Sequence, residues 1–206
     1  MDNLALAYVT CDKYSHIWPK WVDGFVKYFS PDIPFYWCGE EKPAPVELLE
    51  FCPEFIRLRH ESVWPERWTA KLREQIKQIP EENIFVWLDD LVIQKSIRLE
   101  FMEIYFLFNL LDADSFRIMP RNSASNMENV PFTIGGHQVK QLHPGPYMVS
   151  FHPNIFKKEF LLAALRIDES PWECEVKSQN RFHDKNIYSI QIDGWVSNEI
   201  VKGIPQ

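Results

Sequence analysis

Several features are scarce in this sequence of 206 residues, and each absence excludes a class of protein. The chain has only seven glycines, and no glycine-rich phosphate loop follows its first predicted strand. Lysine and arginine do not cluster, and the formal net charge is -7, which argues against a nucleic-acid polymer or an anionic membrane surface as the main partner. The most apolar stretch, 101–111, contains Glu103 and Asn109 and is shorter than the ~20 apolar residues that span a bilayer. We therefore expect no transmembrane segment and a buried helix at 101–111.

The cysteines also lack a pattern. The four of them, Cys11, Cys38, Cys52 and Cys174, show no CxxC spacing, so they predict neither a zinc site nor a disulfide framework. The six histidines show no close zinc-binding spacing. The amino terminus has no basic segment before its first apolar run, which argues against a signal peptide. We expect free thiols in a reducing compartment and a cytoplasmic protein.

What is present is an alternation of strand and helix patterns through the first half of the chain. The predicted strands are 4–10, 35–38, 55–58 and 84–88, and the predicted helices are 15–29, 45–51, 68–79 and 97–111. Such alternation implies right-handed crossovers and a mainly parallel sheet. The sequence therefore predicts an α/β fold with a mixed, mainly parallel sheet flanked by helices.

The second half of the chain has a different character. We expect an edge strand at 116–119, a long irregular stretch at 120–145 with a turn at Gly135-Gly136, and a strand at 147–151. A helix at 157–165 and a final strand at 187–192 complete the prediction. No repeat or interdomain linker is visible, so we expect a single domain over 1–206, which could itself be part of a longer protein.

Two adjacent carboxylates, Asp89 and Asp90, are the most informative feature. They follow the apolar run 84–88, which is typical of a strand covered on both faces, and ligands bind at the carboxyl end of such strands in open α/β sheets. Adjacent like charges raise each other's pKa unless a cation or hydrogen-bond donors compensate. The pair therefore predicts a site for Mg²⁺ or Mn²⁺, and the alternative is a solvated turn.

The order of short segments along the chain adds to this interpretation. In sequence these are 10–14 (Thr-Cys-Asp-Lys-Tyr), 68–72 (Trp-Thr-Ala-Lys-Leu), 88–90 (Leu-Asp-Asp), 116–118 (Phe-Arg-Ile), 147–150 (Tyr-Met-Val-Ser) and 171–175 (Pro-Trp-Glu-Cys-Glu). This succession resembles nucleotide-sugar-dependent glycosyltransferases of the GT-A fold, particularly small bacterial and large-DNA-virus enzymes of surface-glycan synthesis. The resemblance covers nearly the whole chain, although each motif is short. Leu88 stands where the first acid of a full DxD motif would be.

The resemblance implies an enzyme that moves a sugar from a nucleoside diphosphate sugar, expected to be a UDP-sugar, to a hydroxyl of a glycan acceptor. It implies a hexosyltransferase with Mn²⁺ or Mg²⁺ as cofactor, a nucleotide-sugar-binding half at about 1–112 and an acceptor-binding half at about 113–206. Asp90 would bind the metal, while Asp89 would contact the ribose or a metal-bound water. Such a metal stabilises the charge on the departing nucleoside diphosphate.

The resemblance also implies donor-binding residues. Thr10 and Asp12 would contact the base or ribose, and Tyr14 would stack, although a turn held by the Asp12 side chain would give the same sequence. Lys71 would contact a phosphate, and the alternative is a solvated lysine on an exposed helix face.

On the acceptor side, the resemblance implies a carboxylate as the general base. Glu175 matches the more typical position and Glu173 is the reserve; the two would point the same way in an extended segment and diverge in a helix. Trp172 would offer a flat face to a sugar, or else pack in the core.

The remaining predicted residues concern the acceptor pocket and the metal. Arg117, or less closely Arg121, would reach the acceptor or a donor phosphate. Ser150 and His152, two apart on a predicted strand, would line the acceptor pocket, although His152 could instead be structural. His183 is a candidate for a further metal ligand.

Three other functions stay open at this point. A metal-dependent nucleotidyl- or phosphoryl-transferase would need a phosphate loop that is not visible. A non-catalytic carbohydrate-binding domain is favoured by the 15% aromatic content and eight tryptophans. An α/β domain with an acidic turn and no such site is the remaining alternative.

Overall fold

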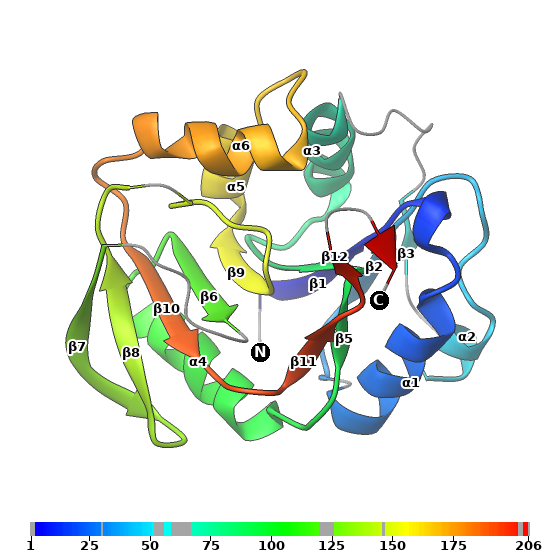
Figure 1. Cartoon of the computed structure of the whole chain (residues 1–206), viewed down its shortest axis with the longest axis horizontal. Helices are drawn as coiled ribbons and strands as arrows, with labels where there is room; N and C mark the ends of the chain where they lie inside the picture. Colours follow the sequence, from blue (N-terminus) through cyan, green and yellow to red (C-terminus); the bar gives the residue numbers. More distant parts are fainter. Residues whose placement is uncertain are drawn as a thin grey trace.

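The computed structural model describes residues 3–29, 31–51, 56–58, 67–119, 126–145, 147–201 and 204–205 (Figure 1). A nine-stranded sheet runs through the molecule in the order β3-β2-β1-β4-β9-β6-β10-β8-β7. Its strands are β1 Leu4–Val9, β2 Phe35–Cys38, β3 Ile56–Arg57, β4 Asn83–Leu88, β6 Ser115–Met119, β7 Met127–Ile134, β8 His137–Leu142, β9 Asn154–Lys157 and β10 Ile187–Gln191. Only β8 and β9 run against the other strands of this sheet, which confirms a mixed, mainly parallel arrangement.

Helices cover both faces of the sheet (Figure 1). They are α1 Trp18–Tyr28, α2 Glu47–Phe51, α3 Trp68–Gln78, α4 Arg98–Leu110, α5 Lys158–Ala164 and α6 Pro171–Lys177. α1 and α4 contribute to one hydrophobic core, and α3, α5 and α6 contribute to the other. β4 serves both, since Phe85 and Trp87 belong to the first core while Ile84 and Val86 belong to the second. No described helix is long and apolar enough to cross a bilayer.

The predicted parallel half of the sheet is confirmed. β3, β2, β1 and β4 are parallel neighbours, and β1 lies between β2 and β4. The chain therefore leaves β1 with a crossover to one side and returns on the other side with β4, and in open α/β sheets ligands bind at the carboxyl ends of strands where the strand order reverses in this way. Val9 pairs with Leu88 at this edge, so Thr10 and Asp89 emerge side by side.

The second half of the sheet departs from the prediction in three places. The predicted edge strand is β6, which lies between β9 and β10 and is buried along its whole length. The irregular stretch contains a hairpin instead, formed by β7 and β8 around the predicted Gly135-Gly136 turn. β10 is not the last strand, because β11 Val196–Asn198, β12 Ile200–Val201 and β13 Ile204–Pro205 follow it. Composition suggested an irregular stretch at 120–145, whereas pairing with β10 stabilises extended structure in the described part of it, 126–145.

The predicted strand at 147–151 is also wrong. Tyr147 has a positive φ of 61°, and the residues after it form bends until β9 begins at Asn154. A left-handed residue interrupts strand geometry, so the sequence pairs with β4 only beyond Pro153.

The predicted helix at 97–111 exists as α4, but it is buried on one side only. Phe101, Ile104 and Phe108 are within the core, whereas the opposite side exposes large apolar side chains. A 13-residue helix cannot turn all its apolar residues toward one sheet, because successive residues lie 100° apart around its axis.

Candidate active site

The carboxyl ends of β1 and β4 are joined by a buried hydrogen-bond network. Asp89 Oδ2 accepts a hydrogen bond from Thr10 Oγ1 at 2.5 Å and lies 3.3 Å from the Cys11 backbone nitrogen, which also donates to it. Trp18 Nε1 donates to Thr10 Oγ1 at 2.6 Å. Burial raises the pKa of Asp89 to about 7, against the lowering effect of the Thr10 hydrogen bond. Thr10 and Asp89, both predicted site residues, therefore hold the two strand exits together.

Asp90 occupies the turn between β4 and β5 Leu91–Ile93, and its environment differs from that of Asp89. Its Oδ1 atom is shielded from solvent and has no hydrogen-bond partner among the described residues. Burial, with a smaller contribution from the nearby carboxylate of Glu175, raises the pKa of Asp90 to about 6. The Asp90 carbonyl accepts a hydrogen bond from the Glu199 backbone at 2.8 Å, which fixes the turn. An anchored carboxylate with an unsatisfied oxygen fits a hard divalent cation.

The protein groups alone do not complete a metal centre. Within the described ranges, no cluster of three or more histidine, cysteine, aspartate or glutamate side chains is arranged to hold a metal ion. Mg²⁺ commonly binds through one or two carboxylates together with substrate phosphates and water. Asp90 therefore suits a cation that arrives with a phosphorylated ligand.

Glu175 reaches this site from α6. One of its carboxylate oxygens accepts a hydrogen bond from the Phe151 backbone nitrogen at 2.8 Å. Burial raises the pKa of Glu175, while the Phe151 and Ser150 hydrogen bonds and the charge of Arg117 lower it. The structure thus brings Glu175 near Asp90 and Arg117 near Glu175, although the three residues lie far apart in the sequence.

Arg117 is a fully buried side chain of β6. Its Nη2 atom donates hydrogen bonds to the carbonyls of Tyr147 and Met148, at 2.6 and 2.8 Å. Burial lowers the pKa of Arg117 to about 10, while Glu175 opposes that shift. Arg117 and Glu175 together hold the 147–151 segment against the site, which explains its irregular backbone.

Glu173 does not share the position of Glu175, because residues 171–177 form a helix and the two side chains diverge. Glu173 forms a capping box with Ser170 and an ion pair with Lys177 at 3.0 Å. The Ser170 backbone hydrogen bond and Lys177 lower the pKa of Glu173 to about 2. The Ser170-Pro171-Trp172-Glu173 sequence is itself a helix-start signal, and it could have predicted this outcome.

Lys71 is neither solvated nor exposed. It lies 3.0 Å from Glu40 Oε1, and both side chains are almost completely buried. Glu40 Oε2 also accepts a hydrogen bond from the Asp12 backbone nitrogen at 2.8 Å. Sequence reasoning missed Glu40, although its place just after β2, at the same sheet edge, was an available signal.

Asp12 and Tyr14 lie in a single 3₁₀ turn, Asp12–Tyr14. The Asp12 carboxylate accepts hydrogen bonds from the Lys42 backbone nitrogen at 3.1 Å, and Lys42 Nζ donates to the Asp12 carbonyl at 3.0 Å. This is the side-chain-stabilised turn that the sequence left open as an alternative. Tyr14 is only 8% exposed, so little of its ring is available for stacking.

The other predicted residues that the structure describes lie in loops and on α6. Ser150 Oγ and His152 Nδ1 are 2.9 Å apart, outside any strand. Trp172 is an exposed residue of α6, one turn before Glu175. His183 is exposed, and Arg121 lies outside the described residues.

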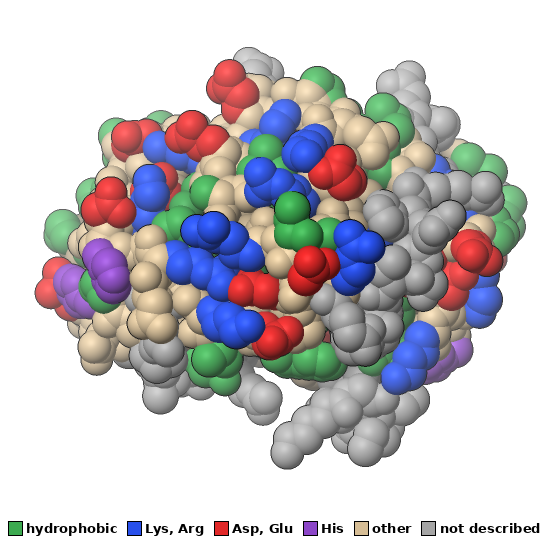
Figure 2. Space-filling view, turned by 90° about the horizontal axis from the view of Figure 1, so that it is seen from above, with side chains coloured by type: hydrophobic (Ala, Val, Ile, Leu, Met, Phe, Trp, Pro, Cys, Tyr) green, Lys and Arg blue, Asp and Glu red, His purple; other side chains and the backbone are tan. Residues whose placement is uncertain are grey.

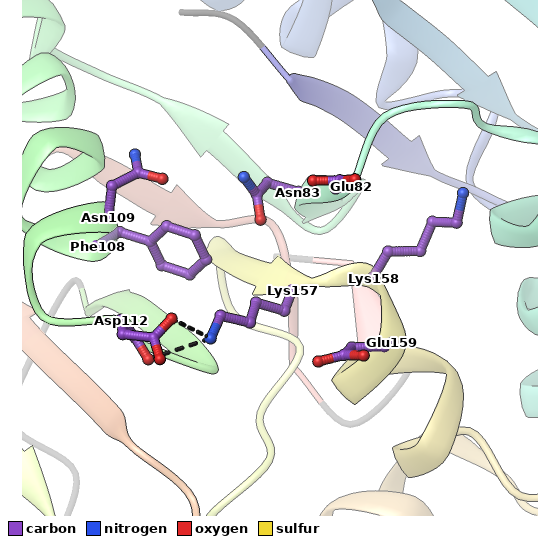
Figure 3. Close-up of a pocket in the computed structure, with 8 residues that line it drawn as sticks. All are labelled: Glu82, Asn83, Phe108, Asn109, Asp112, Lys157, Lys158 and Glu159. Atoms are coloured by element: carbon purple, nitrogen blue, oxygen red, sulfur yellow. Dashed lines mark hydrogen bonds and ion pairs between the residues drawn. The ribbon is translucent and has the colours of Figure 1, made fainter.

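A cavity of about 500 Å³ lies at the other end of β4 (Figure 3). Its lining residues are Glu82, Asn83, Phe108, Asn109, Asp112, Lys157, Lys158 and Glu159. Lys157 Nζ pairs with Asp112 Oδ1 at 2.5 Å, and Lys158 Nζ donates to the Ile79 carbonyl at 2.6 Å. None of the predicted site residues lines this cavity. Because six residues of strand span about 20 Å, it is a separate feature from the Asp89–Asp90 edge.

Comparison with solved structures identifies the fold. TarS residues 1–349 from S. aureus superimposes with a TM-score of 0.60 at 11% identity, covering 94% of this chain and 59% of that one. The chain has a GT-A-like fold. UTP-bound UGPase from Acinetobacter baumannii gives a TM-score of 0.60 at 10% identity, covering 96% of this chain and 88% of that one. A UDP-glucose pyrophosphorylase complexed with UDP-glucose gives 0.60 at 9% identity, with 96% and 93% covered.

The extent of these matches differs. This GT-A-like chain spans 36% of the length of a longer TarS structure, at a TM-score of 0.53, but nearly the whole of the pyrophosphorylases. No family model and no curated protein sequence matches the chain. The similarity therefore resides in the fold, which the resemblance in the sequence had predicted.

Proposed function

We propose that this protein is a metal-dependent glycosyltransferase that moves a sugar from a nucleoside diphosphate sugar, UDP-sugar first among the candidates, to a hydroxyl of a glycan acceptor. The observation that carries the proposal is the convergence of Asp90 and Glu175 at the carboxyl end of β4. The Asp90 carboxylate has an oxygen that is suited to a cation because it has no partner within the described ranges, and the pKa of Glu175 is raised by burial. Solved structures of the same fold with UDP-GlcNAc, UDP and UDP-glucose support this class of donor.

Asp90 would hold a Mn²⁺ or Mg²⁺ ion that arrives with the donor diphosphate. That ion would supply stabilisation of the negative charge that develops on the departing nucleoside diphosphate. Asp89 would have a structural role, because its Oδ2 atom already accepts hydrogen bonds from Thr10 and Cys11. It would keep the two strand exits at a fixed separation and place Asp90 beside the donor.

Glu175 would act as the general base. As an acceptor hydroxyl attacks the anomeric carbon, its proton would pass to the Glu175 carboxylate while the sugar-phosphate bond breaks. A buried carboxylate is a better base than a solvated one, because burial raises its pKa toward the working pH. Arg117 has the opposing effect and would keep Glu175 ionised before the reaction.

The second candidate is nucleotidyl transfer, because two of the similar structures are pyrophosphorylases. The exit of β1 argues against it. Residues 10–16 contain no glycine, and they include the 3₁₀ turn Asp12–Tyr14. The backbone nitrogens of Cys11 and Asp12 already donate to Asp89 and Glu40. A phosphate cradle needs free backbone amides at this position. Nor does this arrangement suit a purely carbohydrate-binding domain, which has no use for a shielded carboxylate oxygen that finds no partner in the described part of the chain.

One experiment separates the candidates. The protein is incubated with UDP-glucose or UDP-GlcNAc and Mn²⁺, with and without pyrophosphate, and the nucleotide products are resolved by chromatography. Slow release of UDP, with or without pyrophosphate, supports glycosyl transfer. Pyrophosphate-dependent UTP would instead establish nucleotidyl transfer. Formation of neither product, with no Mn²⁺-dependent thermal stabilisation by UDP, would favour the binding domain.

A further inference from the structure

A continuous apolar stripe runs along the outer side of α4. It comprises Leu99, Met102, Phe106 and Leu110, which are 76%, 57%, 66% and 59% exposed. Their spacing of three or four residues places them on consecutive turns of one face, and Figure 1 shows α4 on the outer side of the sheet. The stripe is about 16 Å long at 1.5 Å per residue.

This stripe is unlike the face that α3, α5 and α6 present. There, basic and acidic side chains are mixed and hydrophobic ones are scattered (Figure 2). Single exposed apolar residues are normal, but a contiguous row on one helix indicates a contact surface. Phe101, Ile104 and Phe108 on the opposite side of α4 pack in the hydrophobic core, so the stripe is not needed to hold the helix on the sheet.

We propose that α4 binds a second copy of this chain, in an antiparallel, two-fold arrangement of the two α4 helices. In this arrangement Leu99 of one copy meets Leu110 of the other, and Met102 and Phe106 meet near the symmetry axis. Such a contact is self-complementary and closes with two subunits.

The charges at the ends of the stripe favour this occupant. Lys95 and Arg98 are exposed at its amino end, and the last turn of α4 contains no basic residue. Antiparallel pairing puts the basic end of each helix beside the carbonyl dipole at the carboxyl end of the other. Parallel pairing would instead place like charges together.

A membrane surface suits the stripe less well. Glu103 is exposed in the middle of it, and the net charge of the chain is -7, so an anionic bilayer would repel this face. Four side chains bury less than a standard interface, so we expect a weak dimer with a dissociation constant of about 10–100 µM.

Sedimentation velocity over about 5–300 µM protein tests the proposal. We expect a concentration-dependent dimer in the wild type and at least a tenfold weaker one in Phe106→Glu, which would bury a charge at the centre of the contact. Ile167→Glu is the matched control, because Ile167 is 65% exposed and lies outside α4. A wild type that stays monomeric throughout, or a dimer that Phe106→Glu leaves intact, would overturn the proposal. Thermal unfolding of each variant checks that it is folded.

Disulfide cross-linking tests the antiparallel orientation of the two α4 helices. When Leu99→Cys and Leu110→Cys variants are mixed and oxidised, the antiparallel contact predicts the mixed disulfide as the main product. The described native cysteines are buried and should not compete. Disulfides between two Leu99→Cys chains would contradict the antiparallel arrangement. Monomeric protein that floats with phosphatidylcholine vesicles would show that a membrane occupies the stripe.

Discussion

The carboxylates at the two ends of β4 differ in whether a neighbouring cationic side chain compensates their charge. At the carboxyl end, burial raises the pKa of Asp89 to about 7 and that of Asp90 to about 6, and no described cation neutralises the Asp90 oxygen. At the amino end, Lys157 pairs with Asp112 and lowers its pKa. At the amino end a lysine of the protein compensates the carboxylate charge. At the carboxyl end the charge of Asp90 has no such partner among the described residues, which lowers the stability of the folded state. Such a cost is expected where a ligand brings the missing charge.

The largest effect should come from removing the Asp90 charge at the carboxyl end of β4. We expect Asp90→Asn to abolish Mn²⁺-dependent stabilisation by UDP and to lower sugar transfer about 1000-fold, because the leaving diphosphate loses its cation. Asp112→Asn, at the amino end, should leave both unchanged. Thermal-shift titration with UDP and Mn²⁺ and the UDP-release assay measure the two effects. If Asp90→Asn and Asp112→Asn lost UDP binding and sugar transfer to the same extent, the proposal that only the carboxyl end of β4 binds the metal would be wrong.

Glu175→Gln should be next in size. We expect transfer to fall at least about 100-fold, because a neutral amide cannot accept the acceptor proton, while Mn²⁺-dependent UDP binding persists. Glu173→Gln is the control on the same helix, and it should lower the melting temperature slightly without changing the rate. If Glu175→Gln transferred sugar at the wild-type rate, the base would have to be another residue.

The ion pairs at the two ends should also respond differently. Lys71→Met leaves Glu40 buried without its cation, and we expect it to lower the free energy of unfolding by about 3 kcal/mol. Lys157→Met breaks a pair whose Asp112 side chain is 85% exposed, and it should change stability little. Urea denaturation measures both. Adding Glu40→Gln to Lys71→Met should recover part of the loss, and the absence of recovery would mean that packing, not charge, dominates.

The smallest predicted effect is the pH dependence of stability without metal. A carboxyl group whose folded-state pKa lies above its ordinary value binds protons more tightly when folded. The free energy of unfolding should therefore fall as pH rises from about 4 to about 7. Asp90→Asn should remove about 1–2 kcal/mol of this fall, measured by urea denaturation at pH 4.5 and 7.5.

Asp112 changes the free energy of unfolding with pH in the opposite direction to Asp89 and Asp90. Its lowered pKa contributes stability at neutral pH that is lost as the solution becomes acidic. Because Asp112 is largely ionised in both the folded and the unfolded state above about pH 4.5, Asp112→Asn should leave the wild-type fall between about pH 4.5 and 7.5 nearly unchanged and should reduce the loss of stability below about pH 4. A shallower fall between about pH 4.5 and 7.5 would contradict the charge assignment at the amino end.

Local patterns predicted the parallel half of the sheet well. The alternation of apolar strands with helices such as Trp18–Tyr28 and Trp68–Gln78 is encoded within each segment, and so is the exit of β4 at Asp89. The second half was predicted less well, because β7 and β8 are stabilised by pairing with β10 rather than by strong patterns of their own. The prediction for Glu173 and Glu175 left extended and helical structure open, although the capping sequence at Ser170–Glu173 indicated a helix.

The sequence by itself determined that acidic side chains end a buried strand of an α/β fold, because strand ends and apolar runs are local properties. Only the tertiary structure decided which of them act together. It separated Asp90, whose Oδ1 atom has no partner among the described residues, from Asp89, which bonds to Thr10. It brought Glu175 near Asp90 and Arg117 near Glu175. It also gave Lys71 a buried partner in Glu40. Spacing along a chain does not fix distances between elements joined by long connections, whereas the packing of helices against a shared sheet does.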